Sequence, residues 1–221
     1  MRTLHHWPLD PASRQARIAL AEVGMEVELS AVNPWAPDPD FFARVPEAVP
    51  PALVEGGTVI AGARAICEFA NDAARRHALL ADGALERAEA RRLCDWFDMR
   101  FAAEVGAPIL GEKVERAMLG AGSPDPATLR EGREALRAHL DYVESLLERR
   151  DWLAGRRFSL ADIAAAAHLS AIDFLGEIRW RERKVLKSWY QRIKSRPSVQ
   201  PLLADRLPGM FPPAYYADPD F

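Results

Sequence analysis

The order of strand and helix patterns in the first third of the chain limits the possible folds more than any other feature. Apolar runs bounded by turn residues predict four strands, over residues 3–6, 27–32, 52–55 and 58–60. The last two form a hairpin around Gly56-Gly57. Apolar residues at helical spacing predict helices over residues 13–23 and 63–76. This mixture excludes an all-α or all-β fold for the first third of the chain.

The rest of the chain has helical patterns and no strand pattern. Apolar residues recur at helical spacing in two places, at Leu93, Trp96, Phe97 and Phe101 and at Leu136, Leu140, Val143 and Leu147. An Asp version of the capping box, formed by Ser159 and Asp162, starts a third helix that continues over residues 163–175. A basic helix over residues 183–196, whose charges we expect to face solvent, ends before Pro197, and a short helix follows over 198–206.

These patterns predict an α/β domain followed by an all-α domain. The order strand–helix–strand, an irregular segment, then strand–strand–helix is that of a thioredoxin-like domain, which we place at residues 1–77. We place the all-helical domain at residues 83–206 and a tail rich in proline and aromatic residues at 207–221.

Composition indicates where in the cell the protein works and which kinds of partner it lacks. The formal net charge of −3 gives no electrostatic reason to expect a nucleic-acid partner. No apolar run approaches the ~20 residues of a membrane span, and the N-terminus lacks the apolar core of a signal peptide. Cys67 and Cys94 are far apart and lack C-x-x-C spacing, which fits a reducing cytoplasm. The histidines lack metal-binding spacing. We therefore expect a cytoplasmic protein without membrane insertion, metal or nucleic acid.

Five segments resemble motifs of the glutathione-transferase family, in the family's order, over essentially residues 1–206. They are the start of the first helix (13–20), V-P-P-A-L (49–53), A-I-C-E-F (65–69), W-L-A-G with F-S-L-A-D-I (152–163), and Trp189 with R-P-S-V (196–199). The resemblance implies the glutathione-transferase fold, in which a thioredoxin-like domain precedes an all-α domain.

Ser13 matches the position at which this family activates the sulfur of glutathione. There a hydroxyl or thiol at the start of the first helix stabilises the thiolate, together with the positive end of the helix dipole. Ser13 also suits the simpler role of N-cap of the helix, a position that serine favours. We prefer the N-cap interpretation, because other parts of the glutathione site are missing.

Two departures from the family pattern predict that glutathione is not bound tightly. Pro51 matches the family's cis-proline, and the residue before it normally donates its N–H to glutathione; here that residue is Pro50, which has no N–H. The family's Glu-Ser or Asp-Ser pair, which binds the γ-glutamyl group, is replaced by Gly62 and Ala63. Each lost hydrogen bond is worth roughly 1–3 kcal/mol, so we predict no glutathione cofactor and no catalytic residue.

Two stretches carry aromatic residues that call for a packing or binding role. Trp35 follows the second predicted strand in a proline-rich loop, and it either packs back on its own domain or binds a partner. The tail either packs across the chain's own groove or docks on a partner. Our candidate partner-binding residues are Trp35, Tyr215, Tyr216, Asp218, Asp220 and Phe221.

A subgroup of the family shares these features. The segment 9–20, Trp35 after a proline and the ending Tyr-Ala-Asp-Pro-Asp-Phe (216–221) resemble the glutathione-transferase-like division proteins of alphaproteobacteria, which bind the tubulin-like protein FtsZ. The resemblance implies a homodimer at the division site that binds and curves FtsZ filaments, promotes constriction and uses no glutathione. Our leading hypothesis is therefore a non-catalytic adaptor. The alternatives are a glutathione transferase or thiol reductase of low activity that uses Ser13, and a scaffold for another partner.

Overall fold

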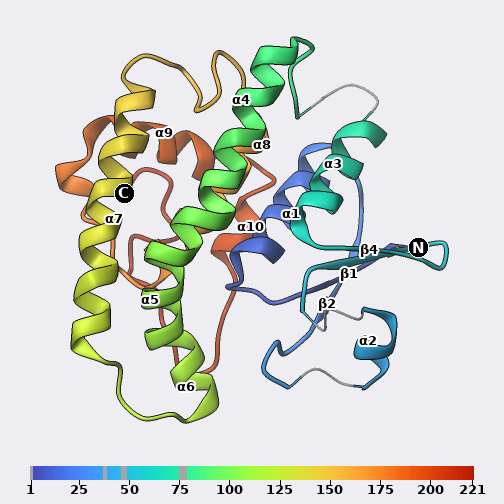
Figure 1. The fold of residues 1–221 in the computed structure, drawn as a ribbon, viewed down its shortest axis with the longest axis horizontal. Helices are drawn as coiled ribbons and strands as arrows, with labels where there is room; N and C mark the ends of the chain where they lie inside the picture. Colours follow the sequence, from blue (N-terminus) through green and yellow to red (C-terminus); the bar gives the residue numbers. More distant parts are fainter. Residues whose placement is uncertain (1, 37–38, 46–48, 75–78) are drawn as a thin grey trace.

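The structure, a computed structural model, describes residues 2–36, 39–45, 49–74 and 79–221. Figure 1 shows a small domain with a sheet beside a larger helical domain. The sheet ends at Ala61, and the described chain from residue 79 onward holds helices and two isolated bridges. The predicted fold class, an α/β domain followed by an all-α domain, is confirmed. The predicted helix end at residue 76 and domain end at residue 77 lie outside the described residues.

The sheet has the strand order β2-β1-β3-β4. Its strands are β1 (Arg2–His6), β2 (Glu28–Ala31), β3 (Ala52–Glu55) and β4 (Thr58–Ala61). β1 runs parallel to β2 and antiparallel to β3, and β3 and β4 form the predicted hairpin. The turn residues Gly56 and Gly57 have φ angles of +55° and +85°. Glycine adopts this left-handed region without strain, so the Gly-Gly pair specifies the hairpin.

Helices cover both faces of the sheet. They are α1 (Pro11–Glu22), α2 (Pro39–Arg44) and α3 (Ala63–Ala73). α1 and α3 share the main core with Leu4 of β1. α2 packs on the other face, where the ring of Phe41 lies 5.3 Å from the ring of His5, measured between centroids. Neighbouring residues of a strand point to opposite faces, so Leu4 and His5 contribute to different layers.

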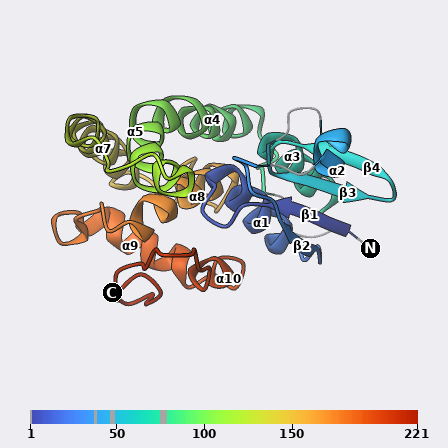
Figure 2. The same ribbon diagram turned by 90° about the horizontal axis from the view of Figure 1, so that it is seen from below.

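Helix α8 is the centre of the second domain. The helical segments there are α4 (Ala84–Asp95), the π-helical η1 (Trp96–Gly106), α5 (Ala107–Leu110), the π-helical η2 (Gly111–Glu115), α6 (Arg116–Leu119), α7 (Pro126–Leu147), α8 (Leu160–Phe174), the 3₁₀ helix η3 (Trp180–Glu182), α9 (Lys184–Lys194) and α10 (Gln200–Leu203). All 15 residues of α8 are buried, because α4, α5 and α7 lie on one side of it and α9 and α10 on the other (Figure 2). Within the described ranges, no helix combines the length and apolar character of a membrane span.

The predicted capping box starts α8 and lies in the core. The side chain of Ser159 accepts a hydrogen bond from the N–H of Ala161 (3.3 Å), and Asp162 accepts one from the N–H of Ser159 (3.0 Å). The other carboxylate oxygen of Asp162 accepts from the N–H of Leu153 and the indole N–H of Trp189, both at 3.0 Å. Asp162 therefore joins the loop before α8, the start of α8 and the helix α9.

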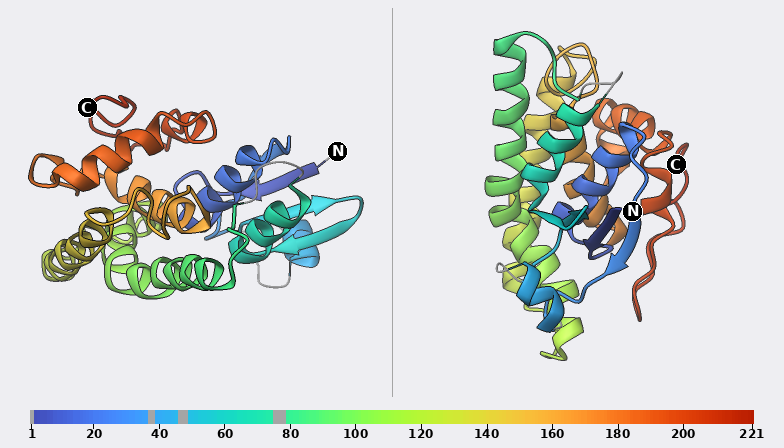
Figure 3. Two further views of the ribbon diagram at one scale, coloured as in Figure 1. Left: turned by 90° about the horizontal axis from the view of Figure 1, so that it is seen from above. Right: turned by 90° about the vertical axis from the view of Figure 1, so that its right-hand side faces the viewer.

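The tail packs on the helical domain around a buried lysine. Figure 3 shows the tail beside α9, on the side of the molecule away from α4 and α5. The side chains of Lys194 and Asp173 are fully buried and lie 3.6 Å apart. Lys194 donates to the backbone carbonyls of Tyr215 (3.3 Å) and Asp218 (3.4 Å), and its ammonium lies 3.7 Å from the ring centroid of Phe221. The expectation that the charges of the basic helix face solvent is thus wrong for Lys194, because the tail covers it.

We expect Asp162→Ala to lower the free energy of unfolding by about 3 kcal/mol, because several buried donors lose their acceptor. Ser159→Ala should lower it by only about 1 kcal/mol, the usual effect of losing an N-cap. Urea unfolding followed by circular dichroism measures both effects. Equal losses for the two variants would contradict the connecting role of Asp162.

His6 provides a test that depends on pH. Burial, reinforced by the positive charge of Arg17, lowers the pKa of His6 from 6.5 to about 4. As the pH falls the unfolded chain binds a proton first, so the stability due to neutral His6 is full above pH 6.5 and is lost between pH 6.5 and about 4. Relative to a non-titrating His6→Gln variant, the wild type should lose about 2 kcal/mol of unfolding free energy between pH 7.5 and pH 5. Urea unfolding at both pH values is the measurement, and a constant difference would refute the assignment.

Candidate functional site

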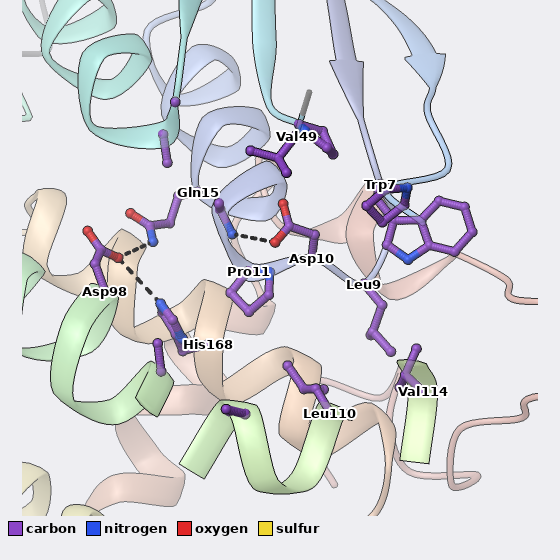
Figure 4. Close-up of a pocket in the computed structure, with 18 of the residues that line it drawn as sticks. Trp7, Leu9, Asp10, Pro11, Gln15, Val49, Asp98, Leu110, Val114 and His168 are labelled. Atoms are coloured by element: carbon purple, nitrogen blue, oxygen red, sulfur yellow. Dashed lines mark hydrogen bonds and ion pairs between the residues drawn. The ribbon is translucent and has the colours of Figure 1, made fainter. Parts of the chain in front are cut away.

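A cavity of about 900 Å³ lies between the two domains. Apolar side chains line most of it, among them Trp7, Leu9, Pro11, Pro34, Trp35, Val49, Pro50, Leu110 and Val114. Among the described residues, the ionisable ones in its lining are Asp10, Arg64, Asp98, Glu115 and His168. Figure 4 shows Asp98 and His168 at one end and Trp7 at the other. Its size suits a small-molecule ligand.

Helix α1 begins beside this cavity with Asp10 as its N-cap. The Asp10 carboxylate accepts hydrogen bonds from the N–H groups of Ala12 (3.4 Å) and Ser13 (2.7 Å), and Pro11 occupies the first helical position. Aspartate at the N-cap followed by proline is a strong start signal. The prediction that Ser13 caps the helix is therefore wrong, because the Asp-Pro pair starts the helix earlier.

Ser13 itself lies in the interior of the protein, next to residues that line the cavity. It is fully buried, and its hydroxyl accepts a hydrogen bond from the backbone N–H of Trp7 at 3.0 Å. Ala12 lines the cavity but Ser13 does not, as far as the described residues show. The hydroxyl therefore fixes the loop that carries Trp7, and its placement does not favour activation of a ligand thiol.

A carboxylate already occupies the position where α1 could stabilise an anion. The positive end of the helix dipole faces Asp10, so a glutathione thiolate placed there would meet a negative charge. The two cysteines of the chain do not supply a thiolate either. Both are buried, and burial raises the pKa of Cys94 to about 12.

The peptide bond between Pro50 and Pro51 is cis. The carbonyl of Pro51 accepts a hydrogen bond from the N–H of Gly62 at 2.9 Å, which holds this loop against the start of α3. Pro50 is buried and lines the cavity. Because proline has no N–H, Pro50 offers no backbone donor to a peptide-like ligand.

The two residues at the start of α3, Gly62 and Ala63, offer no side-chain ligand group. Gly62 is its N-cap, with a φ of +85°, and the described residues give this end no side-chain cap. Gly62 and Ala63 both line the cavity, and neither carries a carboxylate or a hydroxyl. Besides the Arg64 side chain, which also lines the cavity, the polar groups at this end are the backbone N–H groups of the first turn of α3.

Asp98 of η1 connects the two domains at the inner end of the cavity. Gln15 donates to it at 2.5 Å, Arg64 lies 3.3 Å away, and the Nε2 atom of His168 lies 3.4 Å away (Figure 4). Arg64 also pairs with Asp95 at 2.6 Å. The charge of Arg64 is therefore matched within the protein and is not free to bind an anionic ligand.

Trp35 packs back on its own domain. Its ring meets that of Trp7 edge to face, with centroids 5.5 Å apart and an interplanar angle of 85°. Both rings line the cavity, and Trp35 remains partly exposed. Trp35 thus combines packing with an accessible surface.

The tail lies away from the cavity. None of its described residues contributes to the cavity lining, so of the two alternatives for the tail, packing across the chain's own groove is not the one that the structure shows. Tyr216 is fully buried, with its hydroxyl accepting a hydrogen bond from Arg14 at 2.9 Å, and it anchors the tail instead of facing a partner. The tail residues that keep exposed surface include Tyr215, Asp218, Asp220 and Phe221.

Comparison with known proteins gives the family. The family model described as "Glutathione S-transferase, N-terminal domain" matches residues 11–73. The model described as "Glutathione S-transferase, C-terminal domain" matches residues 126–192. The chain is 52% identical over 224 residues to "FtsZ-localized protein A" of Caulobacter vibrioides, covering 100% of this chain and 98% of that protein. The chain belongs to the glutathione S-transferase family.

Two solved structures match this protein over the whole length of its chain. FzlA from C. crescentus matches with a TM-score of 0.97 and 51% identity, over 100% of this chain and 99% of that one. A glutathione S-transferase from Rhodospirillum rubrum F11 matches with a TM-score of 0.96 and 41% identity, over 100% of both chains. The resemblance predicted from the five motifs and from the ending of the chain is confirmed.

Sequence reasoning missed Asp10, Gln15 and Asp98 as residues of the cavity. The pair Asp10-Pro11 is a recognisable helix start and could have been identified from the sequence. Gln15 and Asp98 are 83 positions apart, and only the fold brings them together. Within the described part of the chain, no group of His, Cys, Asp and Glu is arranged to hold a metal ion.

We expect Ser13→Ala to lower the free energy of unfolding by about 1–2 kcal/mol, because the buried N–H of Trp7 loses its acceptor. The heat measured on mixing with millimolar glutathione should not change, because the hydroxyl does not face the cavity. Urea unfolding and titration calorimetry measure the two quantities. A saturable glutathione signal that disappears in Ser13→Ala would show that the hydroxyl serves a ligand.

Proposed function

We propose that this chain is a non-catalytic adaptor with the glutathione-transferase fold that binds FtsZ filaments, alters their curvature and promotes bacterial cell division. The observation that carries the proposal is the 52% identity, over the whole chain, to a protein named for its localisation with FtsZ. We place the protein in the cytoplasm at the division site.

The cavity supports a non-catalytic role. Pro50 lacks the backbone donor, Gly62 and Ala63 lack the ligand side chains, and Asp10 places a negative charge where the family stabilises a thiolate. Each difference disfavours glutathione, and together they reduce its affinity by a factor of roughly a hundred or more.

The tail supports a protein-binding role. The buried Lys194 fixes its backbone at Tyr215 and Asp218, so the outward surfaces of this segment are held in place before any partner arrives. A preformed surface loses less conformational entropy on binding than a flexible one. The exposed carboxylates of Asp218 and Asp220 then give this surface an acidic character.

A homodimer would suit action on a filament. A two-fold dimer presents two equivalent surfaces, and two contacts on one filament raise the effective affinity of each. Two contacts at fixed geometry can also impose curvature on the filament. The dimer belongs to the proposal and follows from the subgroup resemblance.

The second candidate function is a glutathione transferase or thiol reductase of low activity. Family membership favours it, but Ser13, its expected catalytic residue, is buried and bonded to the backbone of Trp7. Titration calorimetry with millimolar glutathione separates the candidates, because saturable heat would support the enzyme.

Co-sedimentation with polymerised FtsZ tests the adaptor. We expect the wild type in the pellet with the filaments, and electron microscopy should show filaments that are more curved than those of FtsZ alone. Trp35→Ala and Asp220→Lys should weaken binding by about tenfold or more, since both change exposed surface at proposed contacts.

Leu85→Ala is the matched control, because Leu85 is an exposed apolar residue (87%) on α4 with no proposed contact. Point substitutions are preferable to removing the tail, since a truncated chain would uncover Lys194 and Tyr190 and lose stability. Absence of the wild type from the pellet, or equal binding by all variants, would refute the proposal.

A further inference from the structure

The charges around the cavity do not balance. Among its described lining residues, Asp10, Asp98 and Glu115 are carboxylates, and Arg64 is the permanent cation. Arg64 pairs with Asp98 and with Asp95, so its charge is used. In the described structure neither Asp10 nor Glu115 forms an ion pair with a lysine or arginine. The described lining of the cavity therefore has an excess of negative charge.

Two tryptophans add a surface that attracts cations at the same place. The backbone N–H of Asp10 donates to the carbonyl of Trp7 at 3.2 Å, and both residues line the cavity. Ring faces of tryptophan bind ammonium and guanidinium groups. The ring of Trp96 has an arginine 4.8 Å from its centroid, whereas no lysine or arginine of the described residues covers Trp7 or Trp35.

We propose that the cavity binds a small primary amine with an apolar body, and that Asp10 holds its ammonium group. The apolar body would lie against Leu9, Leu110 and Val114, which line the same cavity. The inference stands independently of the FtsZ proposal. The end of α1 contributes about half a positive charge, which the full negative charge of Asp10 outweighs. The volume of about 900 Å³ accommodates such a ligand.

The same balance of charges disfavours anionic ligands. A carboxylate or thiolate in this cavity would lie near Asp10 and Glu115, and the described lining residues offer no free lysine or arginine to pair with it. Burial raises the pKa of Asp10, although hydrogen bonds from Ser13 and Ala12 favour its charged form. An ammonium group beside it would supply the missing counter-charge.

Three probes of one shape and different charge test the proposal. Titration calorimetry on the full chain at pH 7.5 would compare 4-phenylbutylamine, 4-phenylbutan-1-ol and 4-phenylbutanoate. We expect the amine to bind at least about tenfold more tightly than the alcohol, because its ammonium group forms a charge-assisted hydrogen bond with Asp10 and the neutral hydroxyl does not. The carboxylate should bind more weakly than the alcohol.

Asp10→Asn removes the charge and keeps the helix start, since asparagine is an equally good N-cap. Asp125→Asn is the matched control, because Asp125 caps α7 through the same Asp-Pro-Ala sequence at an exposed site outside the cavity. We expect Asp10→Asn to reduce amine affinity by about tenfold and leave alcohol affinity unchanged, while Asp125→Asn changes neither.

Three results would overturn the proposal. The first is an amine that binds no better than the alcohol to the wild type. The second is an equal loss of affinity for amine and alcohol in Asp10→Asn, which would indicate that the substitution changed the shape of the cavity and not only its charge. The third is no saturable binding of the amine. Circular dichroism of each variant confirms that the compared proteins are folded.

Discussion

The buried guanidinium of Arg14 is the contact on which the arrangement of this molecule depends. It is fully buried and donates hydrogen bonds to the carbonyl of Pro8 (2.8 Å) and the hydroxyls of Ser170 (2.8 Å) and Tyr216 (2.9 Å). One side chain of α1 thus fixes the loop after β1, the central helix α8 and the tail. A buried guanidinium needs acceptors for its N–H groups and a counter-charge, and Asp205, 3.7 Å away, supplies the latter.

This contact makes the cavity wall and the tail parts of one rigid unit. Pro8 lies between Trp7 and Leu9, both of which line the cavity, while Tyr216 holds the tail at the other end of the same side chain. Lys194 then fixes the rest of the tail through its backbone carbonyls. The exposed parts of Trp35 and of the tail therefore keep a constant separation, which a partner that touches both would recognise without reordering either.

The sequence predicts the fold well because its strongest signals are local. The Gly-Gly hairpin and the capping box at Ser159 and Asp162 each fix their own segment, and the structure contains both. Arg14 and Lys194 show the limit of such reasoning. Charged residues normally face solvent, and only the tertiary packing of the tail and α8 encloses these two. Asp10 is a different case, because the Asp10-Pro11 pair is a local helix-start signal, whereas the resemblance at Ser13 favours a start three residues later.

The differences in the glutathione site also bear on how such a protein evolves. Pro50, Gly62 and Asp10 belong to three separate segments, the loop before β3, the start of α3 and the start of α1. Under the proposed function, reverting one of them would leave the other two differences in place, so a single mutation would restore little affinity for selection to act on. A lineage that had accumulated all three would then be kept from returning to glutathione chemistry, and its inherited fold would persist for the surfaces that it displays.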